Sequence, residues 1–153
     1  MLPPAPRARV AAVDYGARRV GLALTDPLGL FAQPAGTFAP AEALAELARL
    51  HAAHGLATVV VGWPLDAEGR EGASVDRVRP FVGRLRKALP GVEVAFQDER
   101  DSSRRAVEAL VAAGVRRGAR REKARVDAAA AVVILTDWLA ERDPAERVER
   151  PQR

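Results

Sequence analysis

The sequence predicts an α/β fold in which a five-stranded mixed sheet is flanked by helices on both faces. Short apolar strands follow one another closely at the start, and later strands alternate with amphipathic helices. The run TVVVG at 58–62 is apolar on both faces, as in a central parallel strand covered by helices. With 153 residues, 48% of them hydrophobic, the chain can bury one core. We expect one domain over 1–142 and a polar, flexible tail over 143–153.

The first three predicted strands cover residues 9–14, 19–25 and 33–38. Gly16 permits a tight turn between the first two. Because the connections are short, we expect an antiparallel meander.

A helix is expected from Pro40, which suits a first helical position, to Gly55, which suits a helix end. His51 and His54 would lie in its last turn, where imidazole can interact with exposed carbonyls. A metal site is disfavoured because no cysteine or acidic residue in that segment completes a ligand set. The buried strand at 58–62 follows.

The second half of the chain predicts three more helices and one strand. Pro80 should kink the first of these helices or sit in its first turn. A strand at 92–96 precedes a helix that is capped within 101–103 and ends at Gly114. The Ala-rich last helix is expected to open at Asp127. The apolar face of the first helix is formed by Val78, Val82, Leu85 and Leu89.

The order of elements places two acidic residues together. Right-handed crossovers would make the first, fourth and fifth strands parallel, so that their carboxyl ends share one edge of the sheet. Ligands of open α/β sheets usually bind at that edge. Asp14 and Glu99 would both lie there.

Each acidic candidate has a structural alternative. Asp14 ends an apolar strand, where a carboxylate is costly without a compensating cation or donors, but it could instead bond the turn backbone near Gly16. Asp127 lies on the apolar side of its helix, but it could instead be an N-cap. Lys123, one turn earlier if that turn is helical, would neutralise Asp127 or contact a substrate.

Asp98 and Glu99 are adjacent, so on a strand they point to opposite faces and only one can join a given site. The other would be a strand-end or capping residue, and Asp98 could pair with Arg100 or Arg104. Trp63 is expected to anchor packing or a loop rather than to stack on a nucleic-acid base.

Basic residues accompany these acids. The net charge is only +4, but 116–125 holds six cationic side chains against Glu122. The run is either a solvated, mobile loop or a phosphate contact. Nucleases that cut phosphodiesters with divalent ions need carboxylates for the metal and cations for the polyanion. The coupling of acid and base therefore favours a nuclease.

Composition narrows the class further. The absence of cysteine excludes disulfides and thiolate zinc sites. The start, MLPPAPRARV, lacks the apolar stretch of a signal peptide, and no run approaches the roughly 20 apolar residues of a membrane span. We expect a cytoplasmic protein without a membrane partner.

Four ordered segments resemble the YqgF family, also called RuvX: VAAVDYGARRVGLALTD, VVVGWPLDAEGREG, VAFQDERDSSRRAVEAL and KARVDAAAAVVIL. The resemblance covers nearly the whole chain. It implies a ribonuclease H-like fold, likeness to Holliday junction resolvases and nucleolytic maturation of the 5′ end of pre-16S ribosomal RNA.

The resemblance also implies a site. Asp14, Glu99 and Asp127 correspond to the family's acidic catalytic set, which would hold one or two Mg²⁺ or Mn²⁺ ions. The cationic residues expected to contact nucleic acid are Arg18, Arg19, Arg100, Arg116, Arg117, Arg120, Arg121 and Lys123. The chain departs from the family at Trp63, where a smaller apolar residue is usual, and at Asp101, where an apolar residue is common.

Three other functions remain open. The substrate could be branched DNA, for which a two-fold dimer would be informative. The fold could serve as a noncatalytic module that binds ribosomal precursors, or as a sugar-kinase-like or actin-like ATPase, although those proteins generally need two such domains. The sequence leaves monomer and homodimer equally open.

Overall fold

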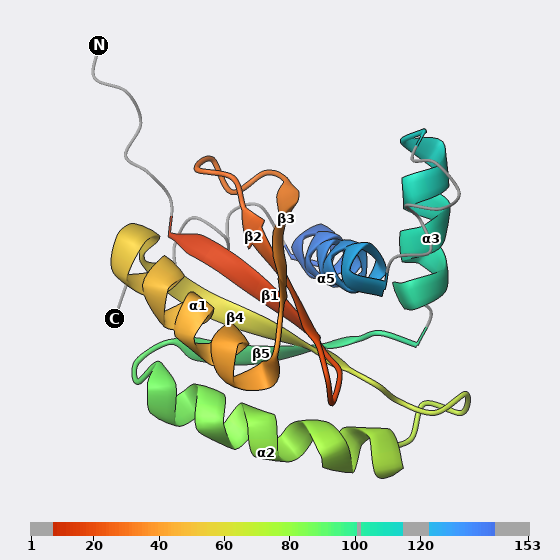
Figure 1. The fold of residues 1–153 in the computed structure, drawn as a ribbon, viewed down its shortest axis with the longest axis horizontal. Coiled ribbons are helices and arrows are strands. Elements are labelled where there is room, and N and C mark those ends of the chain that lie inside the picture. Colours follow the sequence, from red (N-terminus) through yellow and green to blue (C-terminus); the bar gives the residue numbers. More distant parts are fainter. Residues whose placement is uncertain (1–7, 101, 115–122, 143–153) are drawn as a thin grey trace.

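The computed structural model describes residues 8–100, 102–114 and 123–142, which form one mixed sheet with helices on both faces (Figure 1). The strand order across the sheet is β3-β2-β1-β4-β5. The strands are β1 (Arg9–Tyr15), β2 (Val20–Thr25), β3 (Ala32–Phe38), β4 (Leu56–Trp63) and β5 (Glu93–Asp98). The helices are α1 (Pro40–His54), α2 (Ala73–Ala88), α3 (Ser102–Ala112) and α5 (Lys123–Ala140).

The strand directions confirm the predicted topology. β1, β2 and β3 form an antiparallel meander, and β4 and β5 run parallel to β1. The carboxyl ends of β1, β4 and β5 therefore lie at one edge of the sheet, as right-handed crossovers require.

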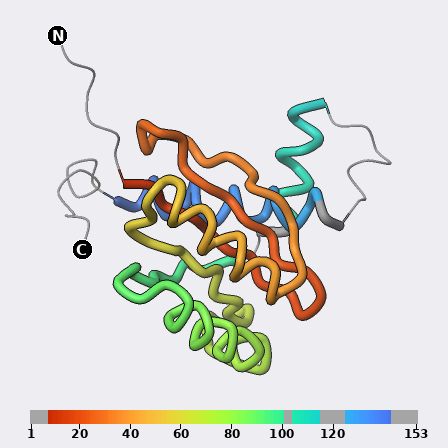
Figure 2. Tube along the Cα trace, turned by 60° about the vertical axis from the view of Figure 1, so that its left-hand side comes forward, coloured from red at the N-terminus to blue at the C-terminus, as the bar shows by residue number. Residues whose placement is uncertain are grey.

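Two apolar cores separate the layers. Helices α1 and α2 cover one face of the sheet, and α5 covers the other with α3 against it (Figures 1 and 2). Ala11 and Val13 of β1 belong to the α1–α2 side, whereas Ala12 packs with α5. Because side chains alternate along a strand, Asp14 faces α5 with Ala12. This alternation decides which helix can contribute to a site at Asp14.

Helix α1 has the predicted limits. It begins at Pro40, and Gly55 follows its end with φ 73°, a backbone conformation that suits glycine. Both histidines lie in the last turn, as expected, and His51 Nδ1 accepts a hydrogen bond from the Leu56 N–H at 2.9 Å. His51 therefore caps the connection into β4.

Helix α2 begins earlier than expected. It starts at Ala73, so the placement of Pro80 in a first turn is wrong and the proline lies inside the helix. The residue is exposed, and burial of Val75 and Val78 holds the preceding turn against the core. Packing therefore outweighs the lost backbone hydrogen bond.

Helix α5 also begins early, at Lys123, so the expectation that Asp127 opens or N-caps this helix is wrong. Asp127 is the fifth helical residue, where its side chain is directed by helix packing and not by capping. The predicted tail, 143–153, lies outside the described residues. None of the described helices is long and apolar enough to cross a membrane.

Candidate metal and nucleic-acid site

Three residues form a row across neighbouring strands beneath α5. Asp14 pairs with Gly21 in the antiparallel β1–β2 register, and Gly62 follows Val61, which pairs with Val13 in the parallel β1–β4 register. The row Gly21, Asp14, Gly62 thus carries one carboxylate between two positions without side chains. The two glycines leave room for groups that arrive from other elements.

Gly21 allows α5 to approach the sheet. A Cβ atom at Gly21 would lie 2.0 Å from the carbonyl oxygen of Asp127, a separation that no packed structure tolerates. The absence of a side chain at Gly21 therefore brings the Asp127 backbone directly over β2, next to Asp14. A glycine in a strand interior often marks such a close backbone approach.

Gly62 provides the corresponding space for Glu99. A Cβ atom at Gly62 would lie 2.5 Å from Glu99 Oε2 and 2.6 Å from Ile134 Cδ1. Glu99 follows β5 directly, and its backbone N–H donates to the carbonyl of Trp63 at 3.3 Å. The Glu99 side chain consequently turns back over β4 toward Asp14.

Asp14 and Glu99 form a hydrogen-bonded carboxyl pair. Burial raises the pKa of Glu99 to about 10, with further contributions from the hydrogen bond and the negative charge of Asp14. Burial also raises the pKa of Asp14 to about 6; the hydrogen bond with Glu99 lowers it and the charge of Asp127 raises it. At neutral pH the pair therefore shares one proton.

Asp127 completes the acidic set but has another partner. Arg19 Nε donates to Asp127 Oδ2 at 3.2 Å, and these residues are 108 positions apart in sequence. Asp127 still lies close enough to raise the pKa of Asp14. The structure therefore brings all three predicted acids to one edge of the sheet. Asp14 and Glu99 share a proton, and Asp127 is paired with the guanidinium of Arg19.

The donor chemistry suits a divalent cation at the Asp14–Glu99 pair. Glu99 Oε2 is buried and has no hydrogen-bond partner within the described part of the chain. An unsatisfied buried carboxyl oxygen is costly, and a hard cation such as Mg²⁺ would satisfy it. As placed, no three acidic or histidine side chains among the described residues are grouped to hold a metal. Asp127 would join as a third ligand only after its side chain leaves Arg19.

The predicted cationic contacts are only partly described. Arg18 is exposed beside the site, whereas Arg19 is engaged with Asp127. Arg100 Nη2 lies 2.7 Å from Asp98 Oδ2, which confirms the expected role of Asp98 as a paired strand-end residue. The expected contacts that lie outside the described residues are Arg116, Arg117, Arg120 and Arg121, and only the backbone of Lys123 is described.

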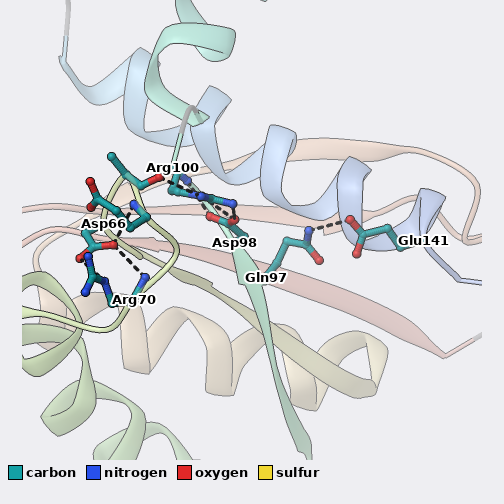
Figure 3. A network of polar contacts seen from close by, with 8 residues as sticks. Asp66, Arg70, Gln97, Asp98, Arg100 and Glu141 are labelled. Atoms are coloured by element: carbon teal, nitrogen blue, oxygen red, sulfur yellow. Dashed lines mark hydrogen bonds and ion pairs between the residues drawn. The ribbon is translucent and has the colours of Figure 1, made fainter.

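A polar hollow of about 590 Å³ lies beside this site. Arg100 forms its ion pair with Asp98 there, and Gln97 Nε2 donates to Glu141 Oε1 at 3.1 Å (Figure 3). Its lining residues are Leu65, Ala67, Gln97, Asp98, Arg100, Arg105, Asp137 and Glu141. Because Arg100 and Arg105 are paired with carboxylates, the hollow attracts phosphate weakly and is secondary to the acidic edge.

Sequence reasoning missed the two glycines that shape the site. Gly62 carried a signal, because it interrupts the apolar β4 run at the point where that strand reaches the site edge. Gly21 lies two residues after Arg19 and carried no comparable signal.

Trp63 was interpreted correctly as a packing residue: its ring contacts Phe96 at a centroid distance of 4.5 Å. Asp101 lies outside the described residues.

Comparisons with known proteins show the family to which the chain belongs. A family model described as "RuvX: Holliday junction resolvase" matches residues 8–141. A Salinibacter ruber protein is 52% identical over 86% of this chain and 92% of its own length, and a Chlorobium luteolum protein is 46% identical over 89% and 96%. Both carry the name "Putative pre-16S rRNA nuclease".

Among solved structures, one titled as the T. thermophilus RuvC in complex with Holliday junction substrate aligns with a TM-score of 0.53. It has 18% sequence identity and covers 86% of this chain and 93% of that one. At this identity the likeness concerns the fold, which is ribonuclease H-like as expected. The family match and the similarity to relatives named as nucleases define the protein as a nuclease, a phosphodiester hydrolase. The chain belongs to the RuvX family.

Proposed function

We propose that this protein is a divalent-metal-dependent endonuclease that processes the 5′ end of pre-16S ribosomal RNA. The observation that carries the proposal is the hydrogen-bonded Asp14–Glu99 pair, in which Glu99 Oε2 is buried and has no hydrogen-bond partner among the described residues. The names of the two relatives supply the substrate.

Asp14 and Glu99 would hold the metal, with Asp127 as the third ligand and all three as the catalytic set. Mg²⁺ or Mn²⁺, as one or two ions, would stabilise the attacking and leaving oxygens of the phosphodiester. Loading requires Glu99 to lose the proton that it shares with Asp14, so metal affinity should rise with pH. It also requires Asp127 to separate from Arg19.

Once released, Arg19 can contact a substrate phosphate beside the metal. Arg18, which is exposed, would contact the same strand, and Arg100 would do so after exchanging Asp98 for phosphate. The same role is proposed for Arg116, Arg117, Arg120, Arg121 and Lys123. Such contacts give affinity that falls with salt and little preference for base sequence. The substrate would then be chosen by its shape.

A second candidate substrate is branched DNA. The description of the matching family names Holliday junction resolvases, and the T. thermophilus structure contains such a junction. The catalytic chemistry would be the same, so only the substrate separates the two functions. A two-fold dimer would favour the junction, because it presents paired cleavage points.

Cleavage assays test the proposal directly. Wild type, Asp14→Asn and Asp127→Asn are compared on end-labelled pre-16S fragments, four-way DNA junctions and single-stranded RNA, with Mg²⁺, Mn²⁺ or EDTA. We expect metal-dependent cleavage of the pre-16S fragment by wild type and loss of cleavage in both variants. Glu42→Gln, an exposed change on α1, is the control. Equal cleavage by Asp14→Asn and wild type would refute the site, and cleavage of the junction alone would reassign the substrate.

A further inference from the structure

A cluster of aromatic and basic side chains lies on the α2 side of the β4–β5 edge. The Trp63 and Phe96 rings pack at a centroid distance of 4.5 Å and are tilted by 58°. The Arg79 guanidinium lies 5.4 Å from the Trp63 ring centre, and that of Arg86 lies 6.0 Å from the Phe96 ring centre. We call these four residues the aromatic–basic surface.

Phe96 is the exposed aromatic ring of this surface. Its exposure is 40%, and it lies in β5, an edge strand of the sheet. A single exposed apolar residue needs no explanation, but this ring is adjoined by an indole and covered on one side by a guanidinium. Aromatic rings and guanidinium planes are the groups on which unpaired bases stack.

Trp63 is held in position from two sides. Its Nε1 donates to Glu71 Oε1 at 3.1 Å, and Glu71 also pairs with Arg79. Arg79 is thus partly neutralised and serves to fix the indole beside Phe96. Arg86 lies seven residues, about two helical turns, after Arg79, and it is the cation placed over the exposed ring.

The exposed side of α2 extends this positive charge. Within Ala73–Ala88 there are five cationic residues against one acidic residue, Asp76, and all five cations are exposed. They are Arg77, Arg79, Arg84, Arg86 and Lys87. At about 100° per residue, Arg79 and Arg86 lie on the flank of α2 next to the aromatic rings, whereas Arg77 and Arg84 lie on the opposite flank, with Lys87 between the two flanks. The other cations therefore add positive charge over the rest of the exposed side of the helix, which attracts a polyanion.

The surface adjoins the acidic site through the backbone. Trp63 is the last residue of β4, and its carbonyl accepts the hydrogen bond from the Glu99 N–H at 3.3 Å. Trp63 and Asp98 are partners in the β4–β5 register, two residues beyond the pair Val61 and Phe96. A strand held at the carboxylates on the α5 face can thus continue around the sheet edge onto the aromatic–basic surface.

We propose that the aromatic–basic surface binds an unpaired single-stranded RNA segment of the substrate, with one base stacked on Phe96 and phosphates contacted by Arg86 and the α2 cations. This rests on the proposed nuclease function, which it deepens by adding a strand-binding site away from the carboxylates.

The test measures binding of fluorescein-labelled oligouridine to the full chain in EDTA, so that cleavage plays no part. Phe96→Ala should weaken binding about tenfold, since one base stack on an aromatic side chain is worth about that factor. Phe96→Trp should restore it, and Arg86→Gln should weaken binding and lower its salt dependence. Phe31→Ala, a still more exposed ring between β2 and β3, and Arg49→Gln on α1 are controls that should bind as wild type does.

Trp63 supplies a second readout. Oligouridine stacked on Phe96 should change the emission of Trp63, whereas Trp138 is buried in the α5 core and should report nothing. Unchanged affinity in Phe96→Ala, with unchanged Trp63 emission, would overturn the proposal. Equally tight, Phe96-dependent binding of an RNA duplex would overturn the assignment to a single strand. Normal pre-16S cleavage with Phe96-independent binding would reject this site alone, whereas Phe96-dependent binding without cleavage would reject the nuclease proposal alone.

Discussion

Replacing Glu99 by glutamine should abolish most of the loss of stability at alkaline pH. In the folded protein Glu99 has a pKa of about 10, against 4.5 for the ordinary side chain. Between these values the native state binds one more proton than the unfolded chain. The free energy of unfolding therefore falls as pH rises, by about 1.4 kcal/mol per pH unit.

The effect is largest above neutral pH. Asp14, with a pKa of about 6, is ionised above neutral pH, so the window from about pH 7 to pH 9 lies between the pKa values of the two paired carboxyl groups. Over those two units wild type should lose up to about 3 kcal/mol through this proton. Glutamine keeps a donor toward Asp14 without needing a proton, so Glu99→Gln should lose far less.

Urea unfolding in EDTA, followed by tryptophan fluorescence at several pH values, measures the difference. Glu108→Gln, an exposed change on α3, is the matched control and should follow wild type. Other titrating groups contribute equally to both proteins and cancel in the comparison. Parallel loss of stability in wild type and Glu99→Gln would refute the shared proton.

Three further substitutions test how the site is assembled. Gly21→Ala should destabilise the fold by about 1–3 kcal/mol, measured by thermal unfolding, because its Cβ would meet the Asp127 carbonyl at 2.0 Å; unchanged stability would show that α5 can shift freely. Gly62→Ala should weaken Mn²⁺ binding more than it weakens the fold, because it displaces Glu99 Oε2; calorimetry that finds wild-type affinity would contradict this. Arg19→Gln should tighten Mn²⁺ binding by up to about fivefold, because the change removes an ion pair that competes for Asp127 and is worth about that factor. The same change should weaken RNA binding. Weaker Mn²⁺ binding would show instead that Arg19 supports the metal site.

The sequence predicted the sheet well because its signals are local. The apolar strands, the short connections and the handedness of crossovers were enough to place Asp14 and Glu99 at one edge. The errors concern helix starts. Pro80 suggested a late start for α2, but burial of Val75 and Val78 extends that helix to Ala73. Asp127 resembled a cap, but α5 begins one turn earlier, at Lys123.

The features of the site that the sequence could not predict depend on residues that are far apart in the chain. The Arg19–Asp127 pair joins positions 108 apart, and no periodicity links them. The exposure of Phe96 depends on β5 being an edge strand, which the order of elements did not reveal. The raised pKa of Glu99 requires burial beneath α5, which Gly62 makes possible.

Titration with Mn²⁺ at about pH 8, by calorimetry in two buffers of different ionisation enthalpy, tests the central claim most directly. Wild type should bind the ion and release about one proton, since Glu99 must ionise to become a ligand. Asp14→Asn should bind at least tenfold more weakly, as expected for a lost direct ligand. Equal affinity in the two proteins, with no proton released, would contradict a metal site built on Asp14 and Glu99.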